Sequence, residues 1–305
     1  MTVPFTAAIV TNCTQRKAVD AHENLRCLPD ARGLTSLANA WQRRVASAPS
    51  AGTTATLYQG RSISDTAAVA AHLSTRWYVV SAGLGLVPED QSVPSYECTV
   101  AAGSELGDRL ASLSATSSDW WSALTASNPH PLARLIAEGP TLLALPSSYL
   151  RMVRDDLSHV STNQAKHLLI FTSTAGAAVV PARLATSVMP YDDRLESVAG
   201  FAGTRADFPQ RALRHFALEL KAAALPLEEA RAKVTAALAQ RPRPSRPQGA
   251  RLSDDEIRRM LRAQWTRHDG RSTRLLRYLR DEARISCEQK RFSRIWQSLA
   301  AEMRV

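Results

Sequence analysis

The clearest strand signal in the N-terminal half of the sequence is the stretch Arg76-Trp77-Tyr78-Val79-Val80-Ser81-Ala82, and the predicted fold is built around it. Aromatic and β-branched residues dominate it, which is typical of a strand buried on both faces. It runs directly into the glycine-rich stretch Gly83-Leu84-Gly85-Leu86-Val87-Pro88. A buried strand that ends in glycines, before a loop carrying Tyr96, is typical of a ligand-pocket wall. A plain turn would need the same glycines for its dihedral angles, so both interpretations stay open.

Further strands are indicated on both sides of this stretch. Short apolar runs at residues 7–11, 141–145 and 167–172 have the length and composition of buried strands. Segments with helical periodicity alternate with them, at 34–45, 64–74, 120–126, 131–137 and 147–157. Strands that alternate with helices favour an α/β fold with a mainly parallel sheet flanked by helices on both faces.

Positive charge is concentrated at the end of the chain. Residues 241–305 contain 17 Lys and Arg against 8 Asp and Glu, a net charge of +9, while the whole chain carries +10. A basic block on a near-neutral body is the electrostatic footprint of a protein that binds a polyanion. Alternating prolines and arginines in 241–251 predict an extended linker, which separates an α/β catalytic domain at 1–240 from a basic domain at 252–305.

The basic domain has the pattern of three short helices. Ser253 and Glu256 form a capping-box signature, and apolar stripes follow at residues 257–265, 275–279 and 292–303. This spacing predicts an all-α, helix-turn-helix-like unit that binds double-stranded DNA. Arginines that only keep a helical bundle soluble are the alternative. The predicted DNA contacts of this unit are Arg271, Arg274, Arg277, Lys290, Arg291 and Arg294.

Several classes of protein lack support in the sequence. No apolar run reaches 18 residues and the first residues lack a basic signal-peptide pattern, so we expect a cytoplasmic protein with no membrane partner. The four cysteines lack zinc-ligand spacing, and neither GxGxxG nor GxxxxGK[ST] occurs. We therefore expect neither a metal nor a cofactor, and a magnesium-dependent nuclease is unsupported.

Base excision fits the polar segments of the body. One carboxylate could stabilise the positive charge that develops on the sugar or orient a water, and the candidates are the adjacent Asp192 and Asp193. Their alternative is a loop turn with an arginine ion pair. Asn12, at the end of the first strand, could bind the base or that water. A flipped base would contact Cys13, Ser81, Gly83, Tyr96, Tyr191 and Phe201. Flanking phosphates would meet Arg16, Lys17, Arg194, Arg205, Arg211 and Arg214.

Three stretches resemble a group of prokaryotic proteins whose first strand ends in a small-residue turn with Cys and Lys, namely 10–17, 57–60 and 77–87. With 191–194, 203–208 and the basic C-terminal unit, the whole chain resembles bacterial anti-phage DNA glycosylases. The resemblance implies removal of a modified base, a glucosylated hydroxymethylcytosine, from invading phage DNA to leave an abasic site. Asn12 stands where other members of the wider group have serine.

The predicted glycosylase is monofunctional, because no lysine is placed close to the acids in a way that favours a Schiff base, and water is then the nucleophile. Two other functions stay open. A DNA-binding regulator would use the α/β body to sense a small nucleotide-like ligand, and an RNA-base-modifying enzyme would prefer structured RNA to duplex DNA.

Overall fold

The computed structural model describes residues 8–101, 103–244, 250 and 252–303, except for the side chain of Lys290. The chain divides into two compact units, Met1–Arg243 and Pro244–Val305. The division falls inside the proline- and arginine-rich segment 241–251, of which residues 245–249 and 251 lie outside the described part. Each unit has its own apolar core, so each is described by itself.

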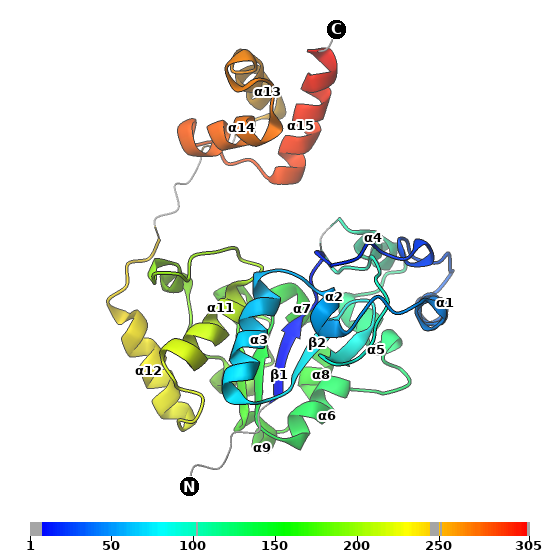
Figure 1. Cartoon of the computed structure of the whole chain (residues 1–305), viewed down its shortest axis with the longest axis vertical. Helices are drawn as coiled ribbons and strands as arrows, with labels where there is room; N and C mark the ends of the chain where they lie inside the picture. Colours follow the sequence, from blue (N-terminus) through cyan, green and yellow to red (C-terminus); the bar gives the residue numbers. More distant parts are fainter. Residues whose placement is uncertain (1–7, 102, 245–249, 251, 304–305) are drawn as a thin grey trace. The chain divides into compact units, whose positions relative to one another are not determined.

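A five-stranded sheet forms the centre of the first unit (Figure 1), in the order β3-β2-β1-β4-β5. Its strands are β1 Ala8–Asn12, β2 Trp77–Ser81, β3 Gly85–Pro88, β4 Thr141–Ala144 and β5 Leu168–Phe171. Strand β1 is parallel to both β2 and β4, and β4 is parallel to β5. Only β3 is antiparallel, because it returns from β2 through a tight turn. The predicted α/β class with a mainly parallel sheet is confirmed.

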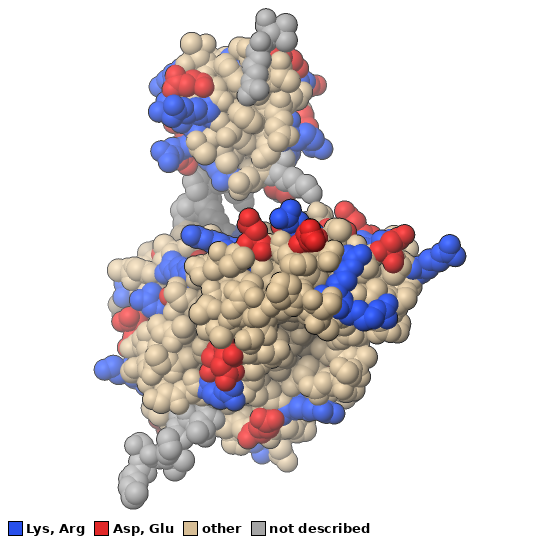
Figure 2. Space-filling view, turned by 45° about the vertical axis from the view of Figure 1, so that its right-hand side comes forward, with Lys and Arg blue, Asp and Glu red and all other residues tan. Residues whose placement is uncertain are grey.

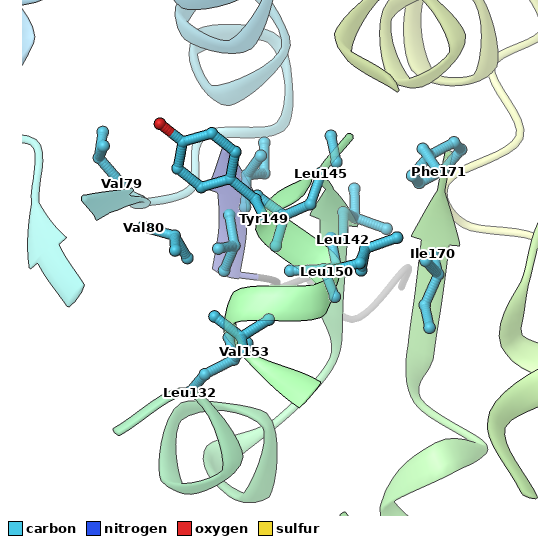
Figure 3. Close-up of a cluster of buried hydrophobic side chains, with 14 of the residues drawn as sticks. Val79, Val80, Leu132, Leu142, Leu145, Tyr149, Leu150, Val153, Ile170 and Phe171 are labelled. Atoms are coloured by element: carbon cyan, nitrogen blue, oxygen red, sulfur yellow. The ribbon is translucent and has the colours of Figure 1, made fainter. Parts of the chain in front are cut away.

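Helices cover both faces of the sheet. Helices α3 and α11 contact each other and the strands on one face, while α5, α7 and α8 contact one another on the other (Figures 1 and 3). Figure 3 shows Tyr149, Leu150 and Val153 in one cluster of buried apolar side chains with the strand residues Leu142 and Ile170. The helices of this unit are α1 Leu34–Ser47, α2 Thr54–Leu57, α3 Arg61–Leu73, α4 Glu105–Ser112, α5 Ser117–Leu124, α6 Pro131–Glu138, α7 Ser147–Met152, α8 Arg154–His159, α9 Thr162–Ala165, α10 Thr174–Ala177, α11 Phe208–Arg214 and α12 Leu227–Ala239.

Short 3-10 and π segments complete this unit. The 3-10 turns are η1 Glu23–Leu25, η2 Ala182–Ser187 and η3 Asp193–Ser197, and a π segment, η4 His215–Glu219, continues α11. The helix expected over residues 147–157 is divided at Val153 into α7 and α8. The stretch expected to form a loop after β2 contains β3 instead, because Leu86 and Val87 pair with Val80 and Val79.

The second unit is a small helical bundle. It contains α13 Asp254–Ala263, α14 Ser272–Arg277, the π segment η6 Tyr278–Glu282, α15 Gln289–Glu302 and the 3-10 turn η5 Thr266–His268. Ser253 and Glu256 form the capping box that the sequence predicts. Helix α15 contains most of the apolar stripe expected at residues 292–303. The core joins all three helices through Ile257, Leu261, Leu275, Leu279, Phe292, Ile295 and Leu299.

Candidate functional site

The carboxyl ends of β1 and β2 bring together polar residues from separate parts of the sequence. Asn12 ends β1 and Ser81 ends β2, and the two strands are parallel neighbours, so both residues lie at one edge of the sheet. Ser81 Oγ lies 2.5 Å from the hydroxyl of Tyr96, which lies 2.7 Å from the hydroxyl of Tyr58. In parallel sheets this edge is where ligands bind. The predicted site residues Asn12, Ser81 and Tyr96 therefore share the site with Tyr58, which lies in the stretch 57–60 but was not among the predicted site residues.

Cys13 extends this cluster toward the other side of β1. Its sulfur lies 3.0 Å from the hydroxyl of Tyr149, at the start of α7. Both side chains are buried, and burial raises the pKa of the Tyr149 hydroxyl well above its usual value. Burial does the same for Tyr58 and Tyr96. All three phenols therefore stay protonated at neutral pH and can act as hydrogen-bond donors.

Lys17 brings a cationic group to the same cluster. Its Nζ lies 4.5 Å from the ring centroid of Tyr96 and 5.9 Å from that of Tyr58. Burial lowers the pKa of Lys17, while the neighbouring Cys13 and Glu97 raise it. Lys17 is half-buried, whereas Arg16 beside it is exposed. Lys17 thus lies inside the polar cluster, and Arg16 on the surface could still reach a phosphate as predicted.

Gly83 shapes the turn against which Tyr96 packs. A Cβ atom at this position would come within 2.6 Å of the Tyr96 ring, so only glycine allows the close approach. The indole nitrogens of Trp41 and Trp120 each donate a 2.7 Å hydrogen bond to this turn, to the carbonyls of Gly83 and Ala82. The predicted role of Gly83 in base binding is therefore indirect, since the residue makes room for Tyr96.

Gln210 joins the cluster to the point where the strand order reverses. Strand β2 lies on one side of β1 and β4 on the other, so the carboxyl ends of β1 and β4 form the topological switch point. Gln210 Nε2 lies 2.9 Å from Thr11 Oγ1, 2.9 Å from Asn12 Oδ1 and 2.8 Å from the carbonyl of Ala144. The side chain is fully buried, and its Oε1 has no hydrogen-bond partner within the described chain. The amide thereby fixes the Asn12 side chain.

The predicted carboxylates lie in a second group of residues. Asp192 accepts hydrogen bonds from the backbone nitrogen of Arg194 at 3.0 Å and from its Nε at 2.9 Å, and it lies 3.6 Å from Arg243. Burial would raise the pKa of Asp192, but the bonds from Arg194 outweigh it and the pKa is lowered. Asp193 lies 4.0 Å from Arg243. Both acids thus have the arginine partners that the alternative interpretation predicted. Within the described residues, no hydrogen bond or ion pair joins them to Asn12, Cys13 or Lys17.

The aromatic residues of this second group are buried. The Tyr191 hydroxyl lies 2.9 Å from His215 Nδ1, and the ring packs on Phe171. Phe201 packs edge-on against the His215 ring. The exposed fractions of Tyr191 and Phe201 are 5% and 4%, so neither ring offers a free face to a base in this structure. This burial corrects the expectation that Tyr191 and Phe201 stack on the base. The same holds for the predicted base contacts Tyr96, Ser81 and Cys13, whose exposed fractions are 0%, 0% and 5%, so base binding requires this part of the structure to open.

Arg211 is the clearest correction among the predicted phosphate contacts. Its side chain has no exposed surface and contacts Glu196, Asp207 and the carbonyls of Phe201 and Thr204. It therefore organises the loop before α11. Asp207 stands at the N-cap of α11 but bonds to Arg211 and caps no backbone nitrogen. Of the other arginines in this group, Arg205 is exposed, Arg194 is half-buried against Asp192, and Arg214 lies 3.5 Å from Asp65.

Asp65 is a buried carboxylate that the sequence did not single out. It lies on α3 between Arg61 at 3.4 Å and Arg214 at 3.5 Å. Burial raises its pKa, and the two arginines oppose that effect. In the sequence, Asp65 lies in the segment 64–74, whose periodicity indicates a helix. Nothing near it in the sequence shows that it is buried or that it faces arginines, so no local signal could have identified it.

Basic residues of the second unit lie on its surface, with acidic ones among them (Figure 2). Arg271 and Arg277 are exposed and have no ion-pair partner within the described chain. Arg274 pairs with Asp269 at 2.5 Å, and Asp254 pairs with Arg291 at 2.6 Å and with Arg294 at 3.6 Å. The side chain of Lys290 lies outside the described residues. A hollow of about 270 Å³ is lined by Thr273, Leu276, Arg277, Arg280 and Asp281.

The protein thus consists of an α/β unit, with a buried polar cluster at the carboxyl ends of its strands, and a separate basic helical unit. Comparisons with protein-family models, with curated proteins and with solved structures find no match to this chain. None of the helices in the described part has the length and apolar character needed to cross a membrane.

Proposed function

We propose that the protein is a monofunctional DNA glycosylase that removes a modified cytosine, in defence against phage. The observation that carries the proposal is the convergence of Asn12, Cys13, Lys17, Ser81 and Tyr96 at one edge of the sheet. Their amide, thiol, ammonium and hydroxyl groups are the kinds of group that read the edge of a flipped base. The basic helical unit would hold the duplex through its phosphates.

The polar cluster supplies donors for the departing base. When the N-glycosidic bond breaks, the base takes the bonding electron pair and the sugar becomes cationic. Tyr58 and Tyr96 are buried in the free protein, so base binding would have to open the cluster; the two protonated phenols and Lys17 would then stabilise the negative charge that develops on the base. A water then adds to the sugar and its proton passes to the departed base, which leaves an abasic site and a neutral free base.

Asp192 is the acid that we assign to the sugar. Hydrogen bonds from Arg194 lower its pKa and keep it ionised at neutral pH, which suits electrostatic stabilisation of a cation. Base binding would have to bring the sugar close to this carboxylate, because no contact joins it to the polar cluster within the described residues of the free protein.

Duplexes that contain glucosylated hydroxymethylcytosine, hydroxymethylcytosine or cytosine test the proposal. We expect alkali-labile sites on the glucosylated duplex, and Asp192→Asn should lower their rate of formation by roughly 100-fold or more. Asparagine is also a good N-cap, so this change retains the cap of η3. Asp193→Asn is the matched control, because Asp193 lies 4.0 Å from Arg243 and its carboxylate accepts no hydrogen bond within the described chain.

Two results would contradict the proposal in different ways. Absence of alkali-labile sites on all three duplexes would remove the glycosylase function, and protection of one defined DNA sequence would then favour a regulator. Full activity in both aspartate variants would retain the function and reject our choice of acid.

A further inference from the structure

Two histidines and an aspartate converge where α6 and α8 pack together. His130 directly precedes α6, while Asp155 and His159 are four residues apart on α8 and so share one face. One ligand atom from each of the three residues lies within 4.8 Å of the others. The two imidazole rings are stacked, with centroids 3.7 Å apart. Imidazole and carboxylate together are a common ligand set for divalent transition metals.

The spacing is close to that of a coordination sphere. His130 Nδ1 lies 3.6 Å from Asp155 Oδ2. Two ligands of a tetrahedral zinc ion, each about 2.0–2.1 Å from the metal, are roughly 3.4 Å apart. All three side chains are half-buried or exposed, so small rotations of exposed groups would close them on an ion.

Other protein groups orient His159 and hold the acid Asp156 beside His130. His159 Nδ1 lies 2.9 Å from the backbone carbonyl of Asp155, which leaves its Nε2 available as a ligand. Asp156 is buried, and its Oδ1 lies 3.5 Å from His130 Nδ1, the same nitrogen that lies 3.6 Å from Asp155 Oδ2. Hydrogen bonds from Trp121 Nε1 and the backbone nitrogen of Leu132 hold Asp156 in place. A backbone carbonyl on the ring nitrogen that does not bind the metal, as at His159, is a common partner of metal-bound histidines.

Charge also favours a cation here. Neither Asp155 nor Asp156 forms an ion pair with Lys or Arg within the described chain, and His130 Nδ1 lies 3.6 Å from Asp155 Oδ2 and 3.5 Å from Asp156 Oδ1. The buried Asp65 and the partly buried Asp192, by contrast, each face two arginines. A divalent ion would supply the positive charge that Asp155 and the buried Asp156 lack.

We propose that His130, Asp155 and His159 bind a divalent transition metal ion of the zinc type, with the buried Asp156 beside His130 adding negative charge to the site. Three protein ligands leave the fourth position of a tetrahedral ion open to water. The site is independent of the glycosylase proposal, because its residues make no contact with Asn12, Lys17 or Asp192 within the described chain.

Calorimetric titration of the full, tag-free chain with Zn²⁺ tests the site. The titration uses a Cys27→Ser background, because an exposed thiol also binds zinc. We expect one ion per chain, and His159→Ala and Asp155→Asn should each weaken binding by at least about tenfold. Co²⁺ should give the visible absorption of a tetrahedral site, and both variants should lose it.

His167→Ala is the matched control, since His167 is an exposed histidine outside the cluster. Its zinc affinity should equal that of the Cys27→Ser background. Absence of one-to-one binding would overturn the proposal, and so would unchanged affinity in both His159→Ala and Asp155→Asn. Glycosylase assays play no part in the readout, so this proposal and the proposed function can fail separately.

Discussion

Lys17 carries its ammonium group into a cluster of phenols and a thiol. Burial lowers the pKa of Lys17 below its ordinary value of 10.5. The nearby Cys13, Glu97 and Cys98 act in the opposite direction and raise it, but burial has the larger effect. As pH rises toward 10.5, the folded chain therefore loses this proton before the unfolded chain does. The unfolded chain then binds more protons, so this group makes the free energy of unfolding rise with pH.

Lys17→Met should remove this pH dependence. Relative to the wild type, we expect the variant to gain stability at pH 7, and the pH-dependent part of the gain should disappear as pH approaches 10.5. That part should be below about 1 kcal/mol, because a partly exposed ammonium group keeps some hydration. Urea unfolding of both proteins from pH 7 to 10 measures the difference. A gap that stays constant with pH would refute the prediction, and the exposed Lys166 provides the control Lys166→Met.

Local sequence identified some residues of the site but not their neighbours. Asn12, Cys13 and Ser81 were predictable because each stands at or next to the end of a recognisable strand. Tyr149 was not, because its contact with Cys13 spans 136 residues of sequence and depends on the packing of α7. Arg211 was expected to be exposed on its helix. Its guanidinium group is buried instead, because loop carbonyls and two carboxylates accept its hydrogen bonds.

At the scale of elements, strand prediction succeeded where the chain is continuously apolar. Strands β2, β4 and β5 were expected from such runs, because strands buried on both faces carry few polar residues. Strand β3 escaped notice, because Gly85 and Pro88 at its ends give it the composition of a loop. Its pairing depends on β2, which is tertiary information. The helix-turn-helix geometry of the C-terminal unit stays a prediction.

Gln210 ties three elements together, and its removal tests how they are held. Gln210→Leu keeps the approximate volume of the side chain but leaves Thr11 Oγ1, Asn12 Oδ1 and the Ala144 carbonyl without this donor. We expect the free energy of unfolding to fall by about 2–4 kcal/mol, since unpaired buried polar groups are costly. Urea unfolding measures the loss. Gln15→Leu on the surface should change it by no more than about 0.5 kcal/mol, and a similarly small loss at Gln210 would contradict the prediction.

For the whole molecule, composition predicted the separation of charge between the two parts. Residues 241–305 hold +9 of the net charge of +10, and the second compact unit begins at Pro244. Composition could not show which arginines are free. Arg274, Arg291 and Arg294 form ion pairs within the unit, whereas Arg271 and Arg277 have none within the described chain. Arginines without acidic partners are the better candidates for phosphate contacts, because no existing pair must be broken.

The double variant Arg271→Ala/Arg277→Ala should therefore weaken binding to duplex DNA of any sequence. If each arginine meets one phosphate, the slope of log affinity against log salt concentration should become shallower by roughly 2. Fluorescence anisotropy between 50 and 200 mM salt, the range over which such contacts change affinity strongly, measures both effects. Arg43→Ala/Arg154→Ala, which removes two exposed charges from the α/β unit, is the matched control. If both double variants lower affinity and slope equally, net charge alone governs binding, and α14 is not the surface that contacts DNA.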